Sequence, residues 1–222
     1  MSIKNISDFF SEISVENIKD FVEKYLTQIV YGMCFVSVII FLTIYAMNRK
    51  IDKESELITS YYQAVSEAKN DKNEEALKIL KDIYNSKYAS DNIKTIAGIR
   101  MAIILGETDK KNEAVEIYKS IYSLKNSDRF LKNLSGLSAL NILINENNPQ
   151  NYPEIEKLFE SLKSIDNPLF LLVREQEGIF EIQKGNVENG IKILSDLLLE
   201  NGIDDATKSR IELILKLYRD NK

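Results

Sequence analysis

Between Lys24 and Arg49 the sequence contains 24 consecutive residues without a charged side chain, YLTQIVYGMCFVSVIIFLTIYAMN. As a helix with a rise of about 1.5 Å per residue, this segment would be about 36 Å long. The hydrocarbon core of a bilayer is about 30 Å thick, so the segment is long enough to cross it. The sequence therefore predicts one transmembrane helix over residues 25–48, in contact with membrane lipid.

The residues that flank this segment also fit a membrane span. Tyr25 and Tyr45 lie toward its ends, where aromatic side chains favour the interface, and Lys24, Arg49 and Lys50 can reach the head groups. Three basic residues lie on each side of the segment, so the positive-inside rule does not decide its direction. The closeness of Arg49 and Lys50 favours a cytoplasmic C-terminal domain, and this orientation stays open as an alternative.

A cleaved signal peptide and a buried soluble helix explain the segment less well. The apolar run is too long for a signal peptide, the residues before it are acidic rather than basic, and no cleavage site follows. A helix that is apolar on all sides would need a much larger soluble protein to cover it. Residues 1–24 are predicted to be a short tail, and its apolar residues have the spacing of an amphipathic helix.

The residue types that support most catalysis are absent or isolated. The chain has no histidine, which excludes Ser-His and Cys-His nucleophile pairs and histidine metal ligands. Its single cysteine, Cys34, lies in the apolar segment and is predicted to be an inert apolar residue. Adjacent acids such as Glu74 and Glu75, or Asp204 and Asp205, do not face one another on a helix, so they form poor acid/base pairs. The sequence predicts no enzyme, cofactor, metal or small-molecule substrate. An enzyme that uses carboxylates alone is the alternative.

The remaining composition favours an all-α protein without a nucleic-acid partner. The chain has only three prolines and eight glycines in 222 residues, which favours long helices. Its net charge of −5 argues against nucleic acid, which requires a basic surface.

After residue 49 the sequence repeats an amphipathic pattern, which predicts a helical-repeat domain over residues 49–222. Four segments share the pattern: NEEALKILKDIY, KNEAVEIYKSIY, YPEIEKLFESLKSI and NVENGIKILSDLLLE. Their equivalent residues are Ala76, Ala114, Ile155 and Gly190, separated by 38, 41 and 35 positions. These intervals are close to the 34-residue period of tetratricopeptide repeats, which are pairs of antiparallel helices.

In three of the four copies, a small residue twelve positions before the equivalent residue completes the tetratricopeptide pattern. The predicted packing pairs are Ala64 with Ala76, Ala102 with Ala114, and Gly178 with Gly190. Seven residues after the first member of each pair comes a residue that tolerates a turn: Asp71, Asp109 and Gly185. The third copy fits if Ala139 is its small residue and about four residues are added to its turn.

The glycine-rich stretch EGIFEIQKGNVENGIKIL could also suggest a phosphate loop, but its spacing matches no nucleotide-binding motif. Its glycines are therefore predicted to pack helices and turn the chain. The last run, DATKSRIELILKLYRDNK, places Ile211, Ile214, Leu215 and Tyr218 on one face, opposite a charged face. It is predicted to be the helix that caps the repeats.

Taken together, the acidic, Phe-rich element ISDFFSEIS, the single span and the divergent repeats with EGIFEIQKGNVENGIKIL resemble the YfgM family. Members of this family are accessory subunits of the bacterial SecYEG translocon. The chain departs from the repeat pattern at Glu177 and Glu181, where large apolar residues are usual, and in its long third turn.

The resemblance implies a single-pass protein of the bacterial inner membrane, with a cytoplasmic N-terminus and a periplasmic repeat domain. It also implies partners: the Sec translocon and the membrane-anchored chaperone PpiD, with which the family hands over emerging secreted proteins. No catalytic residue is carried over. The expected function is that of a non-enzymatic scaffold that binds proteins or peptides. The alternative is a cytoplasm-facing repeat adaptor in envelope assembly or signalling.

Overall fold

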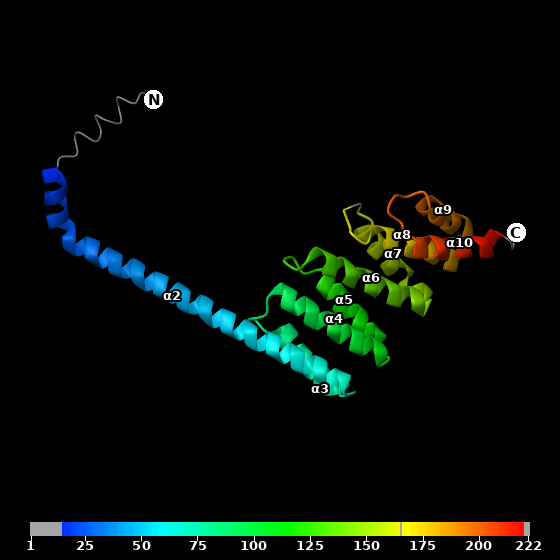
Figure 1. Ribbon diagram of the computed structural model, residues 1–222, viewed down its shortest axis with the longest axis horizontal. Helices are drawn as coiled ribbons and strands as arrows, with labels where there is room; N and C mark the ends of the chain where they lie inside the picture. Colours follow the sequence, from blue (N-terminus) through cyan, green and yellow to red (C-terminus); the bar gives the residue numbers. More distant parts are fainter. Residues whose placement is uncertain (1–14, 165, 220–222) are drawn as a thin grey trace, which may run out of the picture. The chain divides into compact units, whose positions relative to one another are not determined.

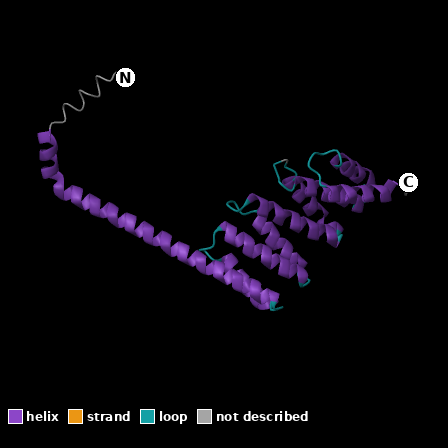
Figure 2. Cartoon of the chain, in the orientation of Figure 1, coloured by secondary structure: helices purple, strands orange, loops and turns teal. Residues whose placement is uncertain are grey.

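The computed structural model describes residues 15–164 and 166–219, and every regular element within them is helical (Figure 2). The all-α prediction is therefore confirmed for the described residues. The first 14 residues of the predicted tail lie outside them. The helices are α2 (Val15–Lys69), α3 (Asn73–Asn85), α4 (Asp91–Glu107), α5 (Lys111–Tyr122), α6 (Arg129–Glu146), the 3-10 helix η1 (Pro149–Asn151), α7 (Tyr152–Leu162), α8 (Phe170–Gln183), α9 (Val187–Leu197) and α10 (Asp205–Arg219).

The chain divides into two units, with the boundary between Lys53 and Glu54. Helix α2 is continuous across this boundary and contains no proline, so no helix end marks the boundaries predicted at residues 24 and 48. The part of α2 in the first unit contains the segment that is long and apolar enough to cross a membrane. The last turns of α2 belong to the second unit, where Ala64 is fully buried.

In the second unit, helices α3 to α10 follow one another in chain order, and each packs mainly on its neighbours (Figure 1). The amphipathic pattern explains this arrangement, because a helix with one apolar face must bury it against the next helix. The first apolar cluster joins the end of α2 to α3 and α4, the second extends from α4 to α8, and the third joins α8, α9 and α10. The core is thus built from contacts between helices close in sequence.

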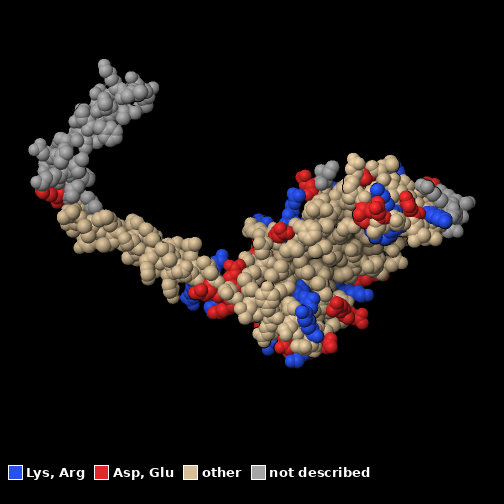
Figure 3. All heavy atoms as spheres, in the orientation of Figure 1, with Lys and Arg blue, Asp and Glu red and all other residues tan. Residues whose placement is uncertain are grey.

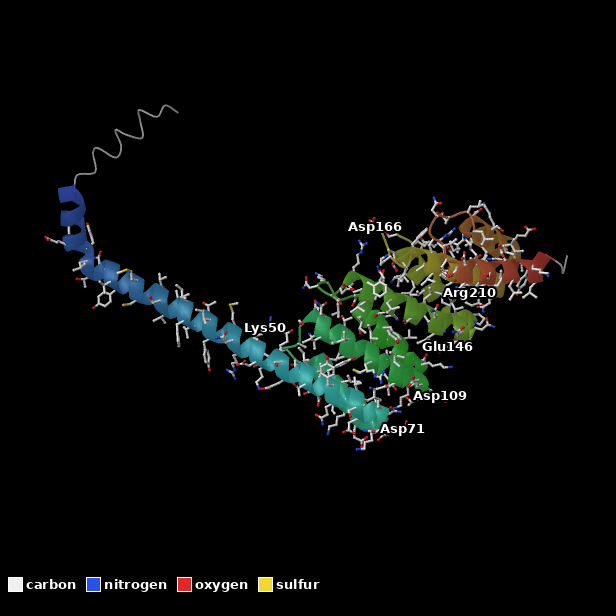
Figure 4. The ribbon with its side chains drawn as sticks, viewed as in Figure 1. Lys50, Asp71, Asp109, Glu146, Asp166 and Arg210 are labelled. Carbon is white, nitrogen blue, oxygen red and sulfur yellow. The ribbon has the colours of Figure 1, made fainter. Side chains whose placement is uncertain are left out.

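The turns inside the successive helix pairs share one backbone conformation and one spacing. Asp71, Asp109, Asn147 and Gly185 all have positive φ, with values of 61°, 58°, 47° and 97°, and they follow one another at intervals of 38 residues. Asp, Asn and Gly are the residues that adopt this left-handed conformation most easily. The turns predicted at Asp71, Asp109 and Gly185 are confirmed. Asp71, Asp109 and Glu146, next to the third turn, lie along one edge of the unit, with Asp166 on the opposite edge (Figure 4).

The connection between α6 and α7 is longer than the other connections within helix pairs because a 3-10 helix follows the left-handed residue Asn147. The three residues of η1, Pro149–Asn151, lie between Asn147 and α7. The Asn148 carboxamide oxygen accepts a hydrogen bond from the backbone N–H of Gln150 at 3.1 Å, which stabilises the start of η1. These three residues account for the interval of 41 between Ala114 and Ile155, and the left-handed turns keep their interval of 38.

Helix α10 packs on α9 through one apolar face, but its opposite face is not purely charged. Ile211 and Leu215 are buried against the third cluster, as the sequence predicts. Leu213 and Leu217 are 60% and 56% exposed and lie among the charged residues of the opposite face. Tyr218, predicted on the buried face, is 39% exposed.

Candidate protein-interaction surface

The small residues predicted to pack within the helix pairs are all buried. Ala64, Ala76 and Ala114 have no exposed surface, and Ala102 is 1% exposed. Alanine in these positions allows two helix backbones to approach closely without a cavity between them. The burial of these alanines is compatible with the predicted close packing within each helix pair.

Gly178 and Gly190 lie at a close approach of two helix backbones. A Cβ built on Gly190 would lie 2.6 Å from the Gly178 carbonyl oxygen and 2.5 Å from Cγ1 of Ile182. A Cβ on Gly178 would lie 2.6 Å from Cγ of Leu194. Only glycine fits at this crossing of α8 and α9, since the clash at Gly190 is with backbone and cannot be relieved by a rotamer change.

Two further glycines that the sequence analysis did not identify have a packing role. Gly98 and Gly136 lie 38 residues apart, and a Cβ on either would meet a side chain of the following helix, Ile121 or Leu162. In the third pair, Ala139 has no exposed surface, as a packing residue should. The interval of 38 between Gly98 and Gly136 was the signal that could have identified them.

The residues predicted to flank the membrane span all lie on α2. Lys24, Tyr45, Arg49 and Lys50 are exposed, and the Lys24 ammonium lies 5.4 Å from the centroid of the Tyr25 ring. Between them the helix carries no charge (Figure 3), and its most apolar window has a mean hydropathy of 2.3 with no residue buried. Exposure of so much apolar surface is unfavourable in water and favourable in a bilayer.

Among the open clefts of the second unit, two with a mainly apolar lining lie beside the α4–α5 pair. The larger of these two, about 490 Å³, is lined by α3, α4 and α5. The smaller, about 310 Å³, is lined by α4, α5 and α6 and includes Ile103, which is 37% exposed. Clefts between stacked helices can hold a side chain or a short peptide segment.

A buried carboxylate that the sequence did not reveal connects α8 to α10. Glu175 is 1% exposed, and Nη2 of Arg210 on α10 donates a hydrogen bond to its Oε2 at 2.8 Å, while Nε donates to Oε1. Thr207 also accepts a hydrogen bond from Arg210, at 3.2 Å. The bidentate geometry satisfies a charge that would otherwise be unfavourable in the core. Glu175 lies three residues before Gly178, on the packed face of α8. This spacing was the only signal in the sequence that Glu175 would be buried.

The two acids that depart from the repeat pattern are held by specific partners. Glu177 is nearly buried and forms ion pairs with Lys163, at 2.6 Å, and with Arg174. Glu181 accepts hydrogen bonds from the side-chain amides of Asn186 and Asn189, both at 2.9 Å. These acids therefore replace apolar contacts with polar ones between α8 and its neighbours, and neither forms a pair with another carboxyl.

The environment of Glu181 predicts a dependence of stability on pH. Burial alone would raise the pKa of Glu181, but the hydrogen bonds from Asn189 and Asn186 and the charges of Lys184 and Lys163 lower it below its ordinary value. A carboxyl whose pKa is lower in the folded state stabilises the fold fully above its unfolded pKa, about 4.3. That contribution is lost as the pH falls through the folded pKa.

We therefore expect the free energy of unfolding to decrease as the pH falls below about 4 to 5. Urea unfolding of the full chain in detergent, followed by circular dichroism from pH 7 to about 3, measures the decrease. The Glu181→Gln variant should show a shallower decrease, and Glu200→Gln, an exposed acid outside this cluster, should match the parent. An unchanged slope in Glu181→Gln would contradict the assignment.

The described residues contain no group of three His, Cys, Asp or Glu side chains placed to hold a metal ion. What the geometry offers is surface: helix pairs joined by close-packed small residues, and clefts between them. Comparisons of the chain with protein-family models, with curated proteins and with solved structures find no match.

Proposed function

We propose that this protein is a membrane-anchored, non-enzymatic scaffold that binds other proteins. The proposal rests on the difference in burial between two parts of α2. Phe35 and Phe41 are 68% and 69% exposed in its apolar stretch, whereas Ala64, further along the same helix, is fully buried in a folded domain. A bilayer around residues 25–48 accounts for the first part, and helix packing accounts for the second.

We further propose that residues 54–222 form a tetratricopeptide-like solenoid closed by α10. The support is the interval of 38 residues between left-handed turns, the buried small residues within each helix pair, and the packing of each helix on its neighbours in sequence. Solenoids of this kind present extended grooves and bind peptides or protein surfaces. The clefts beside α4 and α5 are the candidate contact points.

The proposed topology places the N-terminus in the cytoplasm and the helical domain in the periplasm of a bacterial inner membrane. Alkaline phosphatase fused after Lys222 should therefore be active, because the enzyme needs the oxidising periplasm. A fluorescent protein fused at the same point, active only in the cytoplasm, is the matched control. An inactive phosphatase fusion together with a fluorescent fusion at the same point would indicate the opposite topology. That result would support the cytoplasm-facing adaptor suggested by Arg49 and Lys50.

The proposed partners are subunits of the Sec translocon and a membrane-anchored chaperone similar to PpiD, which follow from the resemblance to the YfgM family. A photo-crosslinking amino acid at Ile103, on the smaller cleft, should give protein adducts in native membranes that mass spectrometry can identify. The same amino acid at Lys216, exposed on α10, is the control position. Adducts from Ile103 that contain neither a translocon subunit nor a chaperone would contradict this assignment of partners.

A further inference from the structure

The larger cleft has a distinct chemistry that points to its occupant. It lies where α3, α4 and α5 meet, and these helices pack side by side (Figure 1). Its floor is apolar and contains Met101 and Leu105, which are 7% and 4% exposed, and Leu77 and Ile117, which are half-buried. The other lining residues are Lys78, Lys81, Tyr84, Asn85, Lys110 and Glu113.

Positive charge lines this cleft from two elements. Lys78 and Lys81 are on α3, three residues apart on one helix face, and Lys110 directly precedes α5. All three lysines are exposed, and in the part of the chain that the structure describes none of them forms an ion pair. Glu113 is the one carboxylate among the lining residues. The cleft therefore has a local excess of positive charge in a chain whose net charge is −5.

The next repeat shows that these lysines are not a general feature of the fold. The residues 38 positions after Lys78 and Lys81 are Glu116 and Lys119. Lys119 is neutralised there, because it forms an ion pair with Glu116 at 2.8 Å and another with Glu154 of α7. At the equivalent positions the lysine of α5 is thus neutralised by carboxylates, whereas α3 leaves two cations at the rim of an apolar cleft.

The walls of the cleft are also held in place before any ligand arrives. The Tyr84 hydroxyl on α3 forms a hydrogen bond with the Ser120 hydroxyl on α5 at 2.8 Å. Gly98 of α4 lets the Tyr84 ring approach, since a Cβ there would lie 3.0 Å from Cε2 of the ring. A preformed cleft loses less conformational entropy on binding than one that must first be ordered.

We infer that this cleft binds an acidic, apolar peptide segment of a partner protein: an aliphatic or aromatic side chain on the floor, with carboxylates on both sides of it. The inference rests on the proposed function, because it identifies the chemical class of partner that the scaffold recognises. Carboxylates flanking an apolar residue match lysines that come from two different elements around the apolar floor. A single phosphate head group would instead need donors that converge on one point.

The test uses the full-length protein in nanodiscs of phosphatidylcholine and a fluorescein-labelled peptide with the repeated sequence Glu-Glu-Leu-Phe. Fluorescence anisotropy should show saturable binding that weakens as salt is raised toward about 0.3 M, because exposed charges are screened. The triple variant Lys78→Gln, Lys81→Gln, Lys110→Gln should bind about tenfold more weakly, as expected for the loss of three exposed charge contacts. A peptide with serine in place of leucine and phenylalanine should not saturate.

A matched control variant distinguishes binding in the cleft from general electrostatic attraction between the peptide and the protein. Lys125→Gln, Lys157→Gln, Lys192→Gln removes the same charge from exposed lysines that do not line the cleft, and it should bind like the parent. Equal binding by the two triple variants, or equal binding of the serine peptide, would overturn the inference. Loss of peptide binding when phosphatidylglycerol is added to the nanodiscs would assign the cleft to anionic lipid and would also overturn it.

These results are separable from a failure of the proposed function. The anisotropy experiment uses purified protein and does not depend on the compartment or on the cellular partner. Absence of peptide binding together with specific protein adducts in membranes would reject the occupant and keep the scaffold. Peptide binding without protein adducts in membranes would keep the proposed occupant of the cleft and reject the proposed scaffold function.

Discussion

Replacing Arg210 with methionine is expected to lower the free energy of unfolding by about 2 to 3 kcal/mol, because the Glu175 carboxylate would remain in the core without its partner. Glu175 is 1% exposed and receives two hydrogen bonds from this guanidinium. The expected cost is below the about 3 to 5 kcal/mol typical of a broken buried pair, since the Arg210 side chain is 50% exposed and water can reach the site. Urea unfolding of the full chain in detergent, followed by circular dichroism, measures the change.

A double-mutant cycle tests whether this loss comes from the isolated charge. Replacing both residues, with Glu175→Leu and Arg210→Met, removes the buried charge together with its partner, so it should be less destabilising than Arg210→Met alone. The exposed pair of Lys208 and Asp205, 3.9 Å apart on the same helix, provides a matched control. Lys208→Met should change the stability by less than about 0.5 kcal/mol. Additive single effects across the cycle would show that Glu175 and Arg210 are not coupled.

Replacing Gly190 with alanine is expected to destabilise the α8–α9 pair by roughly 1 to 3 kcal/mol, even though alanine favours the helix. The added methyl would lie 2.6 Å from the Gly178 carbonyl oxygen and 3.0 Å from the Ile182 nitrogen. Both atoms belong to the backbone of α8, so the two helices would have to move apart. The midpoint of urea unfolding should fall accordingly, and the larger Gly190→Leu should have at least the same effect.

Gly106 is the matched control for this prediction. It is also a helical glycine, in α4, but a Cβ built there would have no neighbour within 4 Å. Gly106→Ala should therefore stabilise the protein, by up to about 1 kcal/mol, through helix propensity and a less flexible unfolded chain. A Gly190→Ala variant as stable as the parent would show that the two helices can separate at no cost.

The elements that the sequence predicted well depend on local chemistry and on a repeated pattern. The turns at Asp71, Asp109 and Gly185 were predictable because few residue types adopt positive φ and because they recur at a fixed distance from small residues. The buried positions of α9 followed from its apolar period of 3.6 residues. In the third pair the pattern was disturbed, since no local signal distinguished three residues of 3-10 helix from a longer turn.

The ion pairs and the charged cleft could not be predicted in the same way. Glu175 and Arg210 are 35 residues apart, and both residue types are usually exposed, so nothing in either segment indicated a buried pair. Lys78, Lys81 and Lys110 had the appearance of ordinary solvent-exposed lysines on two helices. Their position around an apolar floor depends on how α3 and α5 pack across α4.

The sequence by itself determined the helical class, the uncharged segment that predicts the anchor, and the recurring turns between helices, because each of these depends on residues close together in the sequence. The tertiary structure alone decided which charges became paired and which stayed free at the rim of a cleft. The physical reason is that hydrophobic burial depends on a periodic pattern and tolerates many side chains, whereas an ion pair depends on the position of two particular atoms. That position is fixed only when neighbouring helices have packed.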